Sequence, residues 1–95
     1  MKKVILLITM GAFLFGANGI YESKKYPFCI SERYLNDLIQ FSADSDMSSS
    51  IAYYGSSKCF LLEKNIKVSG VKTDWGKVSF TLNGARFWGI KEGIK

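Results

Sequence analysis

The sequence predicts an α+β domain in which two short helices precede a small antiparallel β-barrel that is stapled by one disulfide. Three observations favour this class: apolar residues recur at helical spacing within residues 31–54, they alternate from Cys59 onward, and a second cysteine, Cys29, is present to pair with Cys59. A chain of 95 residues with 47% hydrophobic content is long enough for one small domain.

Residues 1–19 have the pattern of a secretory signal peptide. Two lysines precede an apolar run over residues 4–15, and Ala17 and Gly19 place small side chains at the spacing that signal peptidase accepts. We therefore expect cleavage after Gly19 and a mature domain of residues 20–95, located in the periplasm or secreted, without a stable membrane span. An uncleaved anchor is the alternative, because the apolar segment is near the short limit for crossing a bilayer.

The two cysteines predict a structural disulfide. Export places Cys29 and Cys59 in an oxidising compartment, and a small domain often needs such a crosslink. A loop of about 30 residues corresponds to roughly 3 to 4 kcal/mol in the chain-entropy model. A redox-active pair and a metal site are the weaker alternatives, since the two residues are far apart and form no Cys-x-x-Cys element.

The first half of the mature chain predicts an extended lead-in and two helices. Lys24, Lys25 and Pro27 interrupt any periodicity in residues 20–28, so this segment is expected to be extended. Ser31 is a suitable N-cap for a helix over residues 32–42. Acidic residues then offer new caps, and a second helix is expected over residues 47–54, ending before a glycine.

The second half follows the two-residue period of strands, and its turns are marked by polar residues and glycine. Strands are expected at residues 59–62, 66–71, 77–82 and 85–88. Asn83-Gly84 is the strongest turn signal, because both residues tolerate the positive φ angles of a type I′ hairpin. Thr73-Asp74 predicts an earlier turn, and the last residues predict one helical turn that returns Ile94 to the core.

Part of this strand region resembles a known family. Residues 75–80, then Asn83-Gly84, residues 87–90 and Ile94 look like the distal hairpin and closing strand of bacterial SH3-like domains. The resemblance covers residues 59–94. It implies an SH3-like barrel that acts as an interaction module of the cell envelope and engages wall peptides or partner proteins.

Charge is unevenly distributed along the mature chain. Residues 20–54 carry three basic and five acidic side chains, whereas residues 55–95 carry eight basic and three acidic ones. Outside the cytoplasm, a cationic half favours an anionic surface or an acidic envelope component over nucleic acid. The alternative is an ordinary solvated surface bearing lysines.

The composition argues against an enzyme. The chain has no histidine, so it lacks the usual general base and the commonest metal ligand. Asp44 and Asp46 resemble the start of a calcium loop, but the glycine and distal glutamate of an EF-hand do not follow, and helix capping explains them better. We expect no cofactor and no metal site.

Aromatic and cationic side chains alternate along the predicted hairpin and form the candidate binding site. The site consists of Trp75, Lys77, Arg86 and Trp88, extended by Tyr54 from the second helix. Residues two apart in a strand share a face, so these groups are expected to share a surface that stacks on sugars or grips an acidic peptide. The alternative is that both tryptophans fill the core.

Two functions follow from these features. The first is an exported SH3-like module that binds a wall peptide, a glycan or an envelope protein. The second is a small exported inhibitor or immunity protein that blocks a toxin or a cell-wall hydrolase with a protruding loop, either residues 71–76 or residues 42–50.

Overall fold

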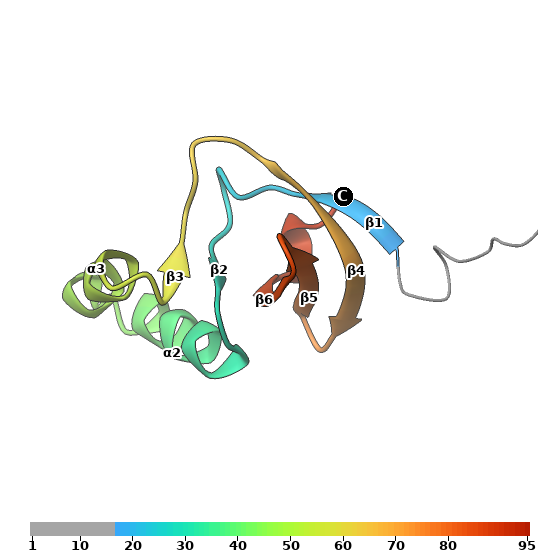
Figure 1. The fold of residues 1–95 in the computed structure, drawn as a ribbon. Coiled ribbons are helices and arrows are strands. Elements are labelled where there is room, and N and C mark those ends of the chain that lie inside the picture. Colours follow the sequence, from blue (N-terminus) through green and yellow to red (C-terminus); the bar gives the residue numbers. More distant parts are fainter. Residues whose placement is uncertain (1–16) are drawn as a thin grey trace, which may run out of the picture.

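The computed structural model describes residues 17–95, in which six antiparallel strands form one open sheet ordered β1-β4-β5-β6-β2-β3 (Figure 1). The strands are β1 (Ala17–Tyr21), β2 (Phe28–Cys29), β3 (Cys59–Phe60), β4 (Ile66–Asp74), β5 (Lys77–Leu82) and β6 (Ala85–Ile90). The helices α2 (Glu32–Ala43) and α3 (Met47–Gly55) lie between β2 and β3 in the chain, and a 3-10 turn, η1 (Lys91–Gly93), follows β6. The predicted leader lies mostly outside the described residues.

The predicted fold class is wrong in two respects. The helices are not N-terminal, because β1 and β2 precede them, and the sheet is not a closed SH3-like barrel. The strand β6 pairs on one side with β5 and on the other with β2, which in turn pairs with β3. The edge of β6 that does not face β5 therefore pairs with β2 and extends the sheet. The helices lie beside β2 and β3, away from β1 (Figure 1).

The first strand, β1, begins in the predicted leader and ends in the segment expected to be an extended lead-in. In β1, Gly19 lies opposite Val68 and Tyr21 lies opposite Ile66 of β4. On the other side of β1, the Ile20 amide donates to the Lys95 carbonyl at 3.1 Å, and an isolated bridge joins Tyr21 to Ile94. The predicted cleavage site after Gly19 therefore falls inside a paired strand.

The two helices begin at side-chain caps close to the predicted positions. The Ser31 hydroxyl accepts from the Tyr34 amide at 3.1 Å at the start of α2. The Asp46 carboxylate accepts from the Ser49 amide at 3.1 Å and from its hydroxyl at 2.7 Å at the start of α3. These bonds satisfy backbone donors that a helix leaves without internal partners.

Side chains pack into two cores on opposite faces of the sheet. The sheet-side core consists of Tyr21, Phe28, Val68, Val78 and Phe80, and the helix-side core of Cys29, Leu35, Leu38 and Cys59. Neighbouring residues of a strand point to opposite faces. The two residues of β2 therefore serve different cores: Phe28 packs on the sheet side and Cys29 on the helix side.

The disulfide between Cys29 and Cys59 is present, as the sequence predicts, and both residues are buried. The two cysteines lie directly opposite each other in β2 and β3, with their Cα atoms 3.9 Å apart. Since these strands have two residues each, the crosslink reinforces a very short ladder.

Among the described residues, none of the helices has the length and apolar character needed to cross a membrane.

Candidate functional site

The most exposed large aromatic side chain of the described residues stands at the tip of the β4–β5 hairpin. Trp75 is 94% exposed, and the turn Trp75-Gly76 is closed by the pair Asp74 and Lys77. The sequence suggested a turn at Thr73-Asp74, but β4 continues through both of these residues. We call Trp75 and Gly76 the hairpin tip.

The backbone of the hairpin tip is strained at its tryptophan. Trp75 has φ 44° and Gly76 has φ 81°, which places both in the left-handed region. Glycine adopts this conformation freely, whereas a bulky L-residue does so only against steric resistance. The other two-residue turn, Asn83-Gly84 between β5 and β6, has φ values of 52° and 81° and uses the residues that such a turn favours.

The pairing of β5 and β6 places three predicted site residues on one face. In this register Lys77 lies opposite Ile90, Ser79 opposite Trp88, and Thr81 opposite Arg86. Alternate residues of each strand share a face, so these six residues share one face of the sheet, which we call the outer face; part of it, at Trp88 and Ile90, packs against the helix-side core. Lys77, Arg86 and Trp88 thus share a face, while Trp75 lies beyond the end of β5 at the hairpin tip.

Lys77 is engaged with α2. Its ammonium lies 2.9 Å from a carboxylate oxygen of Glu32 and 2.9 Å from the amide oxygen of Asn36. An exposed ion pair of this kind contributes at most about 1 kcal/mol. Its main effect is geometric, because it ties the base of the hairpin tip to the first turn of the helix.

Arg86 is held by neutral groups. Its guanidinium donates to the Thr81 hydroxyl at 3.0 Å and to the Ser79 hydroxyl at 2.9 Å. Among residues 17–95, the ion pairs involve other cations. Arg86 therefore presents a positioned positive charge on the outer face that a partner's carboxylate can engage.

Trp88 and Tyr54 contribute to packing. Both are partly buried against the helix-side core, and burial raises the pKa of the Tyr54 phenol. The structure therefore separates the two tryptophans: Trp75 is exposed at the hairpin tip, whereas Trp88 packs beneath the helices. The single surface predicted for all five residues does not form.

A residue that the sequence analysis missed joins the outer face from β4. The pairing of β4 with β5 shifts between Ser69 and Lys72, at a glycine with φ 58°, and the shift places Lys72 opposite Ser79. Val71 instead packs against the sheet-side core. A bulge changes which residues share a face, and the alternation of residue types alone gives no sign of it.

A small hollow connects the hairpin to α2. It has a volume of about 260 Å³ and is lined by Glu32, Lys72, Thr73, Asp74, Lys77, Val78, Ser79 and Trp88. Charges of both signs line it, so it does not select strongly for an anion. The hollow lies next to the hairpin tip, and the exposed Trp75 stands at the end of the same two strands.

The loop at residues 42–50, the second candidate for a protruding tip, uses its carboxylates internally. Asp46 caps α3, and hydrogen bonds from Ser49 lower the pKa of its carboxyl group. The Asp44 carboxylate accepts from the Gln40 amide at 3.1 Å. Among residues 17–95, no group of three or more His, Cys, Asp or Glu side chains is arranged to hold a metal ion.

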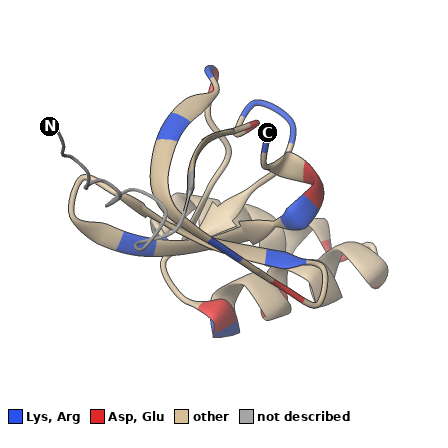
Figure 2. Ribbon diagram, turned by 90° about the vertical axis from the view of Figure 1, so that its right-hand side faces the viewer, with Lys and Arg blue, Asp and Glu red and all other residues tan. Residues whose placement is uncertain are grey.

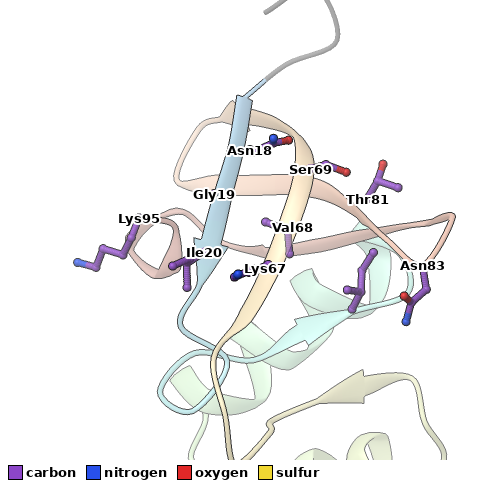
Figure 3. Close-up of a pocket in the computed structure, with 10 residues that line it drawn as sticks. Asn18, Gly19, Ile20, Lys67, Val68, Ser69, Thr81, Asn83 and Lys95 are labelled. Carbon is purple, nitrogen blue, oxygen red and sulfur yellow. The ribbon is translucent and has the colours of Figure 1, made fainter. Parts of the chain in front are cut away.

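An open hollow of about 660 Å³ lies over β1, β4 and β5 (Figure 3). Its labelled side chains spread outward: Lys95 points away from the hollow on one side, and Thr81 and Asn83 lie on the other. They do not converge on a common point. Asn18 and Gly19 also line this hollow, so the predicted cleavage after Gly19 would remove part of it.

Charge distinguishes α3 from the sheet. Lysine and arginine occur along the strands and near the C-terminal turn, whereas α3 carries no charged residue (Figure 2).

In comparisons with known proteins, no family model, curated protein or solved structure matches this chain significantly.

Proposed function

We propose that the chain is an exported binding protein of the cell envelope, cleaved after Gly19, that engages a partner protein by inserting the hairpin tip. The observation that carries this proposal is Trp75, which is 94% exposed and held at φ 44°. Because Trp75 is exposed, its side chain makes little packing contact that could offset the backbone strain. Such strain often occurs at functional sites, and we infer that this residue is kept for binding. Tryptophan is among the residues that dominate interface energetics.

The surroundings of the hairpin tip support a protein partner. The short turn leaves little conformational freedom to lose on binding, and the pair of Lys77 with Glu32 fixes its base. Lys72 lies on the outer face of the same hairpin and can engage a carboxylate beside the inserted ring, whereas Arg86, opposite Thr81, offers its charge toward the other end of β5. A glycan that stacks on Trp75 would not require this cationic flank.

The test is site-specific photo-cross-linking in envelope fractions. A photoreactive residue at position 75 is expected to give one dominant protein adduct, and the same residue at position 83, in the turn at the opposite end of β5, is expected to give none. Excess unlabelled protein should suppress the adduct, whereas the Trp75→Asn variant should not. Equal adducts at both positions, or equal competition by the variant, would overturn the proposal.

The second candidate function, an inhibitor or immunity protein, is favoured by the same protruding hairpin. A single aromatic side chain on a two-residue turn suits insertion into an active-site cleft. If the captured partner is a toxin or a cell-wall hydrolase, the wild-type protein should inhibit it and the Trp75→Asn variant should not. Binding without loss of the partner's activity would leave the interaction module as the function.

A further inference from the structure

A second candidate site is a cleft between the helices and the strand ends. The cleft has a volume of about 810 Å³, within the range of ligand sites. Leu35 and Leu38, both buried, line it from α2, and Leu61 lines it from the segment after β3. No residue of the hairpin tip takes part.

The side chains at the rim of this cleft are apolar and unusually exposed. Ile39 is 43% exposed, Leu61 is 51% exposed and Met47 is 72% exposed. Single exposed apolar residues are ordinary, but a group around a cleft marks a binding surface. The uncharged helix α3 forms one wall, so a hydrocarbon ligand would meet little polar surface there.

Two polar groups in the cleft are not used by the rest of the described structure. Lys25 has no carboxylate within ion-pair distance among residues 17–95, and its ammonium lies 6.0 Å from the centre of the Tyr26 ring. The Tyr54 hydroxyl makes no hydrogen bond to the described residues. Asp46 also lines the cleft, but its carboxylate is occupied by the Ser49 amide and hydroxyl.

We propose that this cleft binds a single-chain fatty acid. The hydrocarbon chain lies over Leu35, Leu38 and Leu61, the carboxylate pairs with Lys25, and the Tyr54 hydroxyl is available as a further donor. An apolar floor with one available cation matches an anionic amphiphile and disfavours a cationic one. The site is independent of the hairpin tip, so it stands or fails separately from the proposed partner binding.

The test is calorimetric titration of the purified, oxidised protein with decanoate and decyltrimethylammonium below their micellar concentrations, and with decanol below its solubility limit. Decanoate is expected to bind with one-to-one stoichiometry and more tightly than the cationic analogue. Shortening it to octanoate should weaken binding about fifteenfold, because each methylene contributes about a factor of four. Trp75→Asn should bind decanoate like the wild type.

Variants separate the roles of charge and apolar surface. Lys25→Gln should weaken decanoate about fivefold and leave decanol unchanged, since an exposed ion pair contributes about that factor. Lys67→Gln, which removes the same charge from β4, should change neither. Leu61→Asp should weaken both ligands at least tenfold, and because Leu61 is half exposed this variant is expected to keep its melting temperature.

Four outcomes would overturn the proposal: no saturable binding, equal affinity for the cationic analogue, an unchanged decanoate affinity in Lys25→Gln, or several ligands bound per chain. Sedimentation of the ligand-free protein addresses a different occupant. A dimer that dissociates on Met47→Glu and does not bind decanoate would assign the cleft to a second copy of the chain.

Discussion

At the scale of single residues, the tryptophan of the hairpin tip opposes local stability. Replacing Trp75 by asparagine gives the dipeptide Asn-Gly, which already forms the turn at Asn83-Gly84. Because asparagine tolerates positive φ and Trp75 is almost fully exposed, we expect Trp75→Asn to raise the free energy of unfolding by about 1 kcal/mol. Urea denaturation measures this; a decrease would show that the ring stabilises the fold.

The buried phenol of Tyr21 predicts a loss of stability at alkaline pH. Its hydroxyl donates to the Pro27 carbonyl and accepts from the Ile90 amide at 2.8 Å, and burial raises its pKa above the ordinary value. The folded state therefore keeps a proton that the unfolded state releases near pH 10. The free energy of unfolding should be unaffected by this group below about pH 10 and fall above it.

Denaturation at a series of pH values, with Tyr21→Phe as the comparison, tests this expectation. The variant loses both hydrogen bonds and should be less stable by about 1 to 3 kcal/mol at neutral pH. Its stability should fall less steeply above about pH 10, because it lacks the shifted group. The same alkaline slope in both proteins would assign the effect to other groups.

The candidate site shows what residue types in a strand can and cannot predict. The alternation in residues 77–82 and 85–90 was sufficient to place Lys77, Arg86 and Trp88 on one face. It could not predict that Lys77 pairs with Glu32 or that Trp88 packs against the helix-side core, because both contacts come from a helix that begins more than 40 residues earlier.

At the scale of elements, the disulfide holds the shortest strands. It joins β2 to β3 across a sequence separation of 30 residues that contains both helices. Its reduction is expected to lower the free energy of unfolding by roughly 3 to 4 kcal/mol, through the greater entropy of the unfolded chain. Thermal melts with and without reductant check this; an unchanged melting temperature would contradict it.

The position of β1 makes processing and stability interdependent. A chain that begins at Ile20 lacks the pairs of Ala17 with Val71 and of Gly19 with Val68, whereas a chain that begins at Ala17 keeps them. We expect the shorter chain to melt at a lower temperature and to exchange the Val68 and Val71 amides faster. The shorter chain should still fold, because it keeps Tyr21, which is part of the sheet-side core and pairs with Ile66. Equal melting temperatures would show that these pairs contribute nothing.

The N-terminal strands were missed for a physical reason. The two residues of β2 cannot show a two-residue period, and Pro27 immediately before them indicates a turn. The glycine at position 89, inside β6, is explained by the close approach of Tyr21. A Cβ atom at this position would lie 2.5 Å from the Tyr21 hydroxyl. A glycine inside a strand often marks a close approach, but only the fold shows which residue approaches.

At the scale of the whole molecule, the sheet lies between two cores that share strands. Leu38→Ala removes packing from the helix-side core and Val78→Ala from the sheet-side core, each at an expected cost of about 2 to 3 kcal/mol. Because β2 and β6 contribute to both cores, each variant should lower one common transition. Circular dichroism and fluorescence should give the same midpoint; separate transitions would show that the two cores unfold independently.

The sequence by itself determined the features that depend on neighbouring residues: the capped helices, the turn at Asn83-Gly84 and the availability of two cysteines for a crosslink. Only the tertiary structure decided the order of strands, the open sheet and the separation of Trp75 from Trp88. Caps and turns are set by backbone geometry over a few residues, whereas strand order depends on pairings between distant segments, such as Tyr21 with Ile66 and Cys29 with Trp88, that no local pattern specifies.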